Sequence, residues 1–164
     1  APFSSAPANN HFEQDGELHV ILTKRTELVA HHKGQVCFPG GSYEMHDESL
    51  WHTAMRETRE ELGLPESGMQ YIMELPKYVT PSEFEVTPFL AFIHSDLEFT
   101  PCPHEVDSVI KVPISHLLDS NNLNFEQLSH AGKEYNLPFY IFEDHKIWGM
   151  TGKIILNLLK NWEK

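Results

Sequence analysis

The sequence predicts a mixed α/β (α+β) sandwich, because strand-like strings are interleaved with two helical ones. Apolar strings of β-like composition recur at four places, residues 17–23, 69–75, 85–94 and 106–112. Helical periodicity marks residues 48–62 and the segment from about Thr151 onwards. A chain of 164 residues has the length of one hydrophobic core. Strands and helices that share one core favour a layered sandwich built on a mixed β-sheet.

The ends of the chain follow from composition and from one apolar stripe. Residues 1–16 are rich in Ala, Pro, Ser and Asn, so we expect a loop with at most a partial N-terminal strand. This start does not read as a secretory signal, and a removed targeting segment stays an open alternative. The last helix carries apolar residues on one face, at Ile154, Ile155, Leu158 and Leu159. We therefore expect residues 1–164 to form a single domain.

Charge and cysteine content narrow the classes of function. The formal net charge of −12 argues against a nucleic-acid partner, because such binding depends on Lys and Arg neutralising phosphates. No apolar run approaches the ~20 residues of a membrane span, so we expect no membrane partner. An acidic protein with an anionic substrate needs another positive charge, and a divalent cation would supply it. The two cysteines, Cys37 and Cys102, form no C-x-x-C pair and favour a cytoplasmic, reducing environment.

The helix over residues 48–62 is the clearest element. Asp47 is the expected N-cap, Gly63 follows the last turn, and Pro65 stops the helix. At about 100° per residue, one arc holds residues expected to pack into the core. These are Leu50, Trp51, Ala54, Met55, Thr58 and Leu62.

A charged arc adjoins this apolar arc. Glu57 and Glu61 lie one turn apart, so their carboxylates can converge, and Glu60 lies beside them. Arg56 can pair with one of these carboxylates and hold it in place. A salt-bridged, solvated surface would give the same pattern. The preceding turn, Pro39–Gly41, favours instead a Mg²⁺ or Mn²⁺ site that a backbone amide or carbonyl approaches closely.

These residues resemble a known motif. Gly41, followed by the run from Arg56 to Leu64, is similar to the Nudix box, G-x5-E-x7-R-E-U-x-E-E-x-G-U, where U is a bulky apolar residue. The interval from Gly41 to Arg56 is one residue longer than in the general box. Asp47 keeps the box spacing from Gly41, whereas Glu48 keeps the spacing to Arg56. The longer interval resembles the branch of the family that hydrolyses coenzyme A.

Four further strings resemble that branch: Leu22–Thr26 with Gly34–Gly41, Val86–Pro88, Glu105–Val106 and Ile147–Thr151. Two positions of the upstream motif differ. Thr26 stands where the branch has Ser or Ala, and Ala30 stands where it has Lys or Arg. Lys33, a little further on, is the residue that could supply the missing charge.

The resemblance implies roles for individual residues. Glu57 and Glu61 would ligate the Mg²⁺ or Mn²⁺, with Glu60 as a third ligand or a general base. Arg56 would orient a glutamate. Glu105 would deprotonate the attacking water or bind a second ion; an ordinary exposed glutamate is an equal alternative. Backbone contacts to the metal and to the substrate are expected at Gly41 and Gly40, and phosphate contacts at Arg25 and Lys33.

The resemblance also implies a Nudix-type α/β/α sandwich and a reaction. The expected substrate is a small nucleotide, foremost coenzyme A or acyl-coenzyme A, cleaved to 4′-phosphopantetheine and 3′,5′-ADP. ADP-ribose, a dinucleoside polyphosphate or an oxidised nucleotide are alternatives. A non-catalytic binding module is a third, which the three retained glutamates of the box disfavour. Self-association into a homodimer is left open.

Overall fold

Short strands make up most of the fold in the computed structural model, which describes residues 4–8, 17–30, 33–80, 83–94 and 96–162. The helices are α2 (Leu50–Leu62), α3 (Ile114–Leu118), α4 (Gly149–Lys160) and the 3-10 turns η1 (Glu66–Gly68) and η2 (Ser120–Asn122). The strands are β1 (Ser4–Ala8), β2 (His19–Arg25), β3 (Val36–Cys37), β4 (Met69–Glu74), β5 (Tyr78–Val79), β6 (Glu85–Val86), β7 (Phe89–His94), β8 (Val106–Pro113), β9 (Leu123–His130), β10 (Lys133–Phe142) and β11 (His145–Ile147).

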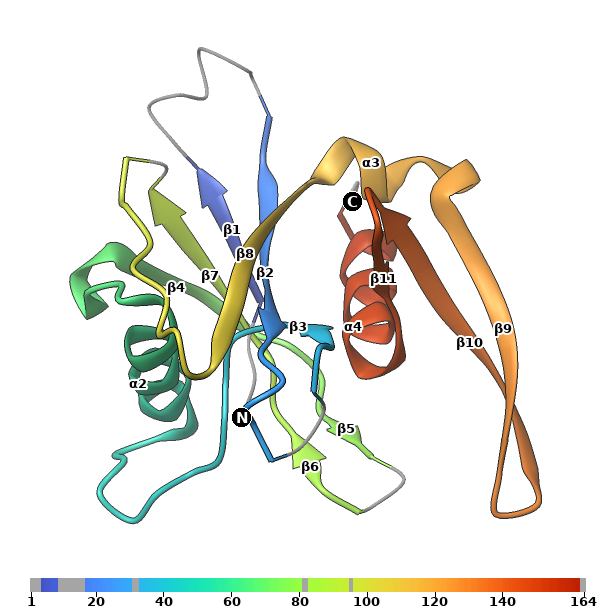
Figure 1. The fold of residues 1–164 in the computed structure, drawn as a ribbon, viewed down its shortest axis with the longest axis horizontal. Coiled ribbons are helices and arrows are strands. Elements are labelled where there is room, and N and C mark those ends of the chain that lie inside the picture. The colour runs from blue at the N-terminus through green and yellow to red at the C-terminus, as the bar shows by residue number, and fades with distance from the viewer. Residues whose placement is uncertain (1–3, 9–16, 31–32, 81–82, 95, 163–164) are drawn as a thin grey trace.

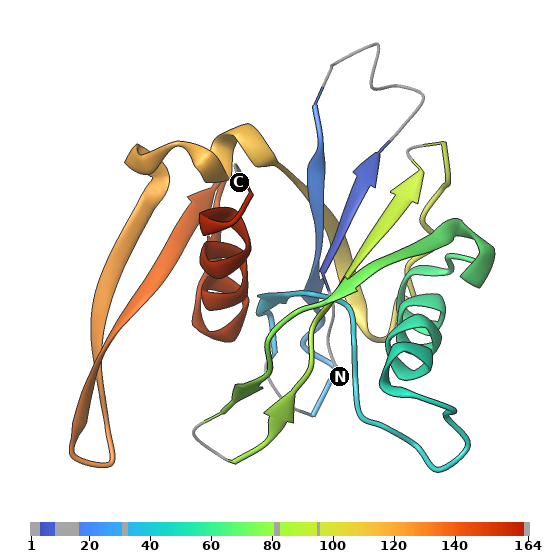
Figure 2. The same ribbon diagram turned by 180° about the vertical axis from the view of Figure 1, so that it is seen from behind.

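Two sheets meet at the centre of the molecule. One has the order β1-β7-β4, with β1 parallel and β4 antiparallel to β7, so the sheet is mixed as expected. The other has the order β3-β2-β8 and is antiparallel throughout. Strands β1 and β2 lie side by side in both views, which joins the two sheets into one layer (Figures 1 and 2).

A helix covers each face of this layer, because β2 sends alternate side chains to opposite faces. Ile21 packs with Leu62 of α2 in one cluster of buried residues. Its neighbours Val20 and Leu22 belong to the cluster that contains the apolar stripe of α4. Figure 1 shows α2 and α4 on opposite sides of β2 and β8. The expected sandwich of helix, mixed sheet and helix is therefore confirmed.

The remaining strands extend the α4 side. Strands β9 and β10 form a long antiparallel hairpin that reaches past α4 (Figure 2). Strand β11 pairs with the other edge of β10. The turn of this hairpin places Ala131 and Gly132 at positive φ, of 51° and 79°. This hairpin was not predicted. Pro138, inside β10, is a residue that disfavours strands, although Gly132 between two alternating strings was a usable turn signal.

Most of the other expected elements are present with shifted ends. The strand expected at 17–23 runs from His19 to Arg25, and the one expected at 85–94 is divided into β6 and β7 around Pro88. A proline cannot donate to a ladder, so it interrupts a strand at this point. Residues 4–8 form a strand, in keeping with the partial N-terminal strand that was allowed for residues 1–16, and residues 1–3 and 9–16 lie outside the described part of the chain.

The ends of α2 confirm one prediction and correct another. Gly63 ends the helix in the left-handed region, at φ 69°, and its N–H donates to the carbonyl of Arg59. The N-cap is Ser49 rather than Asp47, because the Ser49 hydroxyl accepts from the N–H of His52. Asp47 lies further back along the chain and is buried. Its carboxylate instead accepts hydrogen bonds from the side chains of Thr53 and Arg56 in the helix.

Candidate active site

The buried face of α2 is wider than its apolar arc. Ala54, Thr58 and Leu62 are buried as expected. Two charged residues are buried with them, Arg56 at 5% and Glu61 at 7% of full exposure. Trp51 and Met55 pack partly buried against the core. Buried charges are costly unless they are paired or bind an ion, so their partners define the site.

Arg56 is held by the loop that precedes the helix. Its Nε and Nη2 donate to the two carboxylate oxygens of Asp47, at 2.9 and 3.1 Å. Nη2 also donates to the carbonyl oxygen of Ser42, at 3.1 Å. The opposite nitrogen, Nη1, donates to Glu57 at 3.0 Å and lies 3.4 Å from Glu60. Arg56 therefore contacts two of the box glutamates while Asp47 fixes its guanidinium.

Asp47 is the inner end of this network. Besides Arg56 it accepts hydrogen bonds from the hydroxyl of Thr53 and the backbone N–H of Glu44, both at 2.9 Å. These bonds, foremost those from Arg56, hold the pKa of the Asp47 carboxyl well below its usual range. The same pair raises the pKa of Arg56. Sequence reasoning missed this role of Asp47, although its spacing from Gly41, which matches that of the box, was a signal for it.

Glu57 lies against the glycine turn. A Cβ atom placed on Gly41 would lie 2.6 and 2.7 Å from the two carboxylate oxygens of Glu57, closer than van der Waals contact permits. Glycine at position 41 therefore leaves the space that this carboxylate occupies. Desolvation raises the pKa of Glu57, and the nearby charges of Glu60 and Glu105 raise it further, against the lowering by Arg56.

Glu61 is the most deeply placed of the three box glutamates. Burial raises its pKa to about 8, and repulsion from Glu57 and Glu105 adds to this rise. Arg25 and the backbone N–H of Gly40 act in the opposite direction. Glu61 thus lies where α2, the glycine turn, the end of β2 and the residue before β8 come together.

A turn before β8 brings Glu105 to this place. The N–H of Thr100 donates to the carbonyl of Leu62, and that of Cys102 donates to the carbonyl of Glu61, at 2.7 and 2.8 Å. Helix C-termini leave such carbonyls without partners inside the helix. The turn therefore docks on the end of α2, and Glu105 is partly buried there.

Of the two residues predicted to bind phosphate, Arg25 lies near Glu61 and Lys33 does not contact the site. Arg25, at the end of β2, lies close enough to Cys37 and Glu61 to lower the pKa of both groups; burial is the stronger influence on Cys37 and raises its pKa overall. Lys33 is exposed on the loop between β2 and β3. Among the described residues, no hydrogen bond or ion pair joins Lys33 to the carboxylates of α2.

The carboxylates of Glu57, Glu61 and Glu105 fit a divalent cation. They repel one another in a partly desolvated place, and hard oxygen ligands of this kind suit Mg²⁺ and Mn²⁺. Their ligand oxygens are not drawn together as a tight triad. In the part of the chain that the structure describes, three ligand atoms within 4.8 Å of one another occur only at Glu143, Asp144 and His145.

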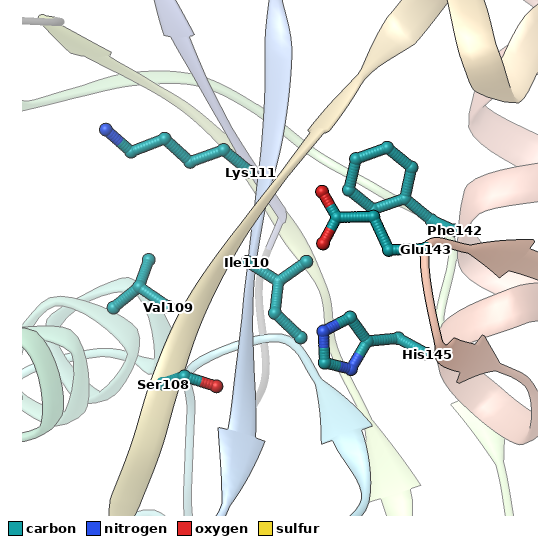
Figure 3. Close-up of a pocket in the computed structure, with 7 residues that line it drawn as sticks. All are labelled: Ser108, Val109, Ile110, Lys111, Phe142, Glu143 and His145. Carbon is teal, nitrogen blue, oxygen red and sulfur yellow. The ribbon is translucent and has the colours of Figure 1, made fainter.

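That second acidic group belongs to the turn between β10 and β11. Glu143 and His145 line a pocket beside β8, together with Ser108 and Ile110 (Figure 3). Figure 3 shows Lys111 on the opposite side of β8 from both of them. The pocket shares no residue with the site on α2. Both Glu143 and Asp144 are exposed, so neither carries the desolvation that marks Glu61.

Comparison with known proteins places this arrangement in a family. Residues 8–130 match the model of the NUDIX domain. The chain is 32% identical over 139 residues to the Nudix hydrolase NudL of Photorhabdus laumondii, which covers 85% of this chain and 74% of NudL. It is 37% identical over 136 residues to the mitochondrial coenzyme A diphosphatase NUDT8 of Homo sapiens, covering 80% of this chain but only 57% of that protein.

Among solved structures, the fold is similar to a Nudix hydrolase of M. smegmatis, RenU. The TM-score is 0.57 at 19% identity, over 72% of this chain and 71% of RenU. The match to the NUDIX model and the similarity to these relatives define a phosphoanhydride hydrolase of the Nudix type. The chain belongs to the Nudix hydrolase family, whose members are diphosphatases that require divalent cations. No helix of the described residues is long and apolar enough to cross a membrane.

Proposed function

We propose that this chain hydrolyses the diphosphate linkage of coenzyme A or acyl-coenzyme A to 4′-phosphopantetheine and 3′,5′-ADP. The observation that carries the hydrolase assignment is the buried Glu61 of α2, which lies within electrostatic reach of Glu57, Glu105 and Arg25. A diphosphate is anionic, and this acidic site would repel it without a cation. The arrangement therefore supports a cation-bridged phosphoanhydride as the ligand.

The roles divide among residues already in place. Glu57 and Glu61 would hold Mg²⁺ or Mn²⁺, with Glu60 at the exposed side as a third ligand or a base, and the backbone at Gly41 lies next to Glu57. When bound, the cation would neutralise the diphosphate and lower the pKa of a coordinated water. Arg56 keeps Glu57 and Glu60 oriented. These assignments explain why a buried arginine lies beside Glu57 and Glu60.

The remaining residues act on the substrate and the water. Glu105 accepts the proton of the attacking water, whose oxygen bonds to one phosphorus while the bridging P–O bond breaks. Arg25 binds a phosphate oxygen, and the N–H of Gly40 lies beside Glu61, where it can also approach the substrate. In-line attack of this kind depends on positioning, and the fastened turn before β8 supplies it.

Coenzyme A is one of two substrate classes that the site supports. The upstream motif and the similarity to NUDT8, named as a coenzyme A diphosphatase, favour it. Ala30 and the exposed Lys33 favour a nucleoside diphosphate derivative without the 3′-phosphate, such as ADP-ribose or a dinucleoside polyphosphate. A 3′-phosphate is bound best by a positively charged side chain held in place, and neither position 30 nor position 33 offers such a side chain in contact with the site.

The test is a substrate panel with purified protein. Coenzyme A, acetyl-coenzyme A, ADP-ribose and diadenosine polyphosphates are incubated with Mg²⁺ or Mn²⁺, and products are resolved by anion-exchange chromatography. We expect 3′,5′-ADP from coenzyme A. If another compound is cleaved while coenzyme A stays intact, that compound and not coenzyme A is the substrate. Absence of cleavage with either metal would refute the hydrolase proposal.

Matched variants then test the site itself. Glu61→Gln removes the buried ligand, whereas Glu48→Gln removes an exposed carboxylate just before the helix. We expect the first to lower kcat by about 10²-fold or more and the second to leave it unchanged. Equal rates for the two variants would show that the cation binds elsewhere.

Cellular location and assembly stay predictions. Cys37 and Cys102 are both free thiols, which fits the reducing, intracellular location expected from the sequence. NUDT8 is named as mitochondrial. Sedimentation of the purified chain would determine whether the homodimer forms.

A further inference from the structure

Hydrogen bonds hold the turn that carries Glu105 from two sides. Towards α2, the N–H groups of Thr100 and Cys102 donate to the carbonyls of Leu62 and Glu61. Within the turn, the carbonyl of Cys102 accepts from the N–H of Glu105, at 3.1 Å. These bonds fix the beginning of the turn to the metal-site helix. They leave the carbonyls of His104 and Glu105 to be bound from the other side.

Thr26 binds both of these carbonyls. Its backbone N–H donates to the carbonyl of Glu105 at 3.1 Å, and its hydroxyl donates to the carbonyl of His104 at 2.6 Å. The same hydroxyl accepts from the N–H of Leu28, at 3.3 Å. Thr26 is buried and its two hydroxyl bonds are partly buried, which limits the access of water to them. One residue thus binds two consecutive carbonyls of the turn, and its hydroxyl serves as both donor and acceptor.

Such a fastening has a physical reason at this place. Glu105 lies near Glu57 and Glu61, and the three negative charges repel one another. Nothing about the charges alone keeps Glu105 in position before a cation and a substrate bind. A hydrogen-bonded backbone can resist this repulsion, because the turn cannot move outwards without breaking these bonds.

We propose that Thr26 is a positioning residue for the reaction, which acts by binding the carbonyls of His104 and Glu105 so that the Glu105 carboxylate faces α2. This inference rests on the proposed role of Glu105 in hydrolysis. It assigns a function to a position where the chain departs from the motif it resembles.

Removal of the Thr26 hydroxyl should affect kcat rather than KM. Arg25, the proposed phosphate ligand, has backbone bonds of its own: its N–H donates to Gln35 and its carbonyl accepts from Gly34, at 2.9 and 3.1 Å. Loss of the Thr26 hydroxyl leaves these bonds intact. Substrate binding should therefore change little, while the step that needs Glu105 should slow.

The experiment is a double-mutant cycle with a conservative control. Thr26→Val removes the hydroxyl and keeps the shape, Thr26→Ser keeps the hydroxyl, and Glu105→Gln removes the charge. With the substrate that the panel identifies, we expect Thr26→Val to lower kcat by about 10- to 100-fold and to change KM by less than about threefold. Thr26→Ser should restore kcat to within about threefold of the wild type.

Coupling separates a positioning role from a general loss of stability. In the Glu105→Gln background, Thr26→Val should change kcat by less than about twofold, because the group it positions is already absent. A full additional loss in that background, or equal losses for Thr26→Ser and Thr26→Val, would overturn the inference. An unchanged kcat for Glu105→Gln would overturn it as well.

A second readout keeps the inference separate from the proposed function. Deuterium uptake in peptides covering residues 100–106 should rise in Thr26→Val and stay at the wild-type level in Thr26→Ser. If the wild type cleaves nothing in the panel, the hydrolase proposal fails, and this uptake still decides whether Thr26 holds the turn. Equal uptake in all three proteins would show that Thr26 does not hold the turn that carries Glu105.

Discussion

The buried carboxylate of Glu61 should make the metal-free protein less stable as the pH rises. Burial and two neighbouring glutamates raise its pKa from an ordinary 4.5 to about 8. Below pH 4.5 the folded and unfolded states both hold the proton. Between pH 4.5 and 8 the unfolded state releases it and the folded state keeps it, so stability is lost over this interval.

The size of the effect follows from the same two values. At about 1.36 kcal/mol for each pH unit, the interval from 4.5 to about 8 amounts to about 5 kcal/mol. Glu61→Gln removes this cost and keeps an oxygen that can accept from the N–H of Gly40. At pH 8 the metal-free variant should therefore melt about 10 °C or more above the wild type, and at pH 4 the two should melt together.

Thermal unfolding in EDTA, followed by circular dichroism between pH 4 and 8.5, measures this difference. Glu48→Gln is the control, because it removes an exposed carboxylate beside the same helix and should follow the wild type. A gap between Glu61→Gln and the wild type that stays constant with pH would refute the reasoning. So would a variant that is less stable than the wild type at pH 8.

Three further outcomes are expected. Gly41→Ala should keep the fold but lower kcat by about 10- to 100-fold, because the new Cβ displaces the flexible carboxylate of Glu57; circular dichroism and kinetics measure the two effects. Asp47→Asn should lower the melting temperature at neutral pH, since Asp47 is ionised in its pair with Arg56; the gap from the wild type should shrink as the pH falls below 3.8, where that contribution is lost. Chelation of divalent cations should abolish turnover, and addition of Mg²⁺ at pH 8 should raise the melting temperature of the wild type more than that of Glu61→Gln.

The sequence was informative where periodicity and turn residues agree. The arc of α2, its end at Gly63 and the sandwich layers all follow from local patterns that tertiary packing reinforces. The hairpin of β9 and β10 was missed, because its outer residues are exposed and Pro138 obscures the alternation. Long-range pairing of this kind depends on partners that a local pattern does not contain.

For the proposed site, the sequence suggested which residues take part, and the structure adds how they are held. The helical spacing of Glu57 and Glu61 brought both to one side, and the structure places Glu105 beside them. What local spacing could not give is the pair of fastenings on the Glu105 turn, one from the end of α2 and one from Thr26. Those bonds join residues far apart in the chain.

The extra residue between Gly41 and Arg56 posed a question that only the structure answers. Counting from Gly41 selects Asp47 as the acid of the box, and counting back from Arg56 selects Glu48. Asp47 is buried and holds Arg56 with both oxygens, whereas Glu48 is exposed. The spacing from the glycine turn is the one preserved, because the N–H of Glu44 binds Asp47 and fixes the loop before the helix starts. The added residue is therefore absorbed between Asp47 and Arg56, where Ser49 caps the helix independently of the acid that anchors the arginine.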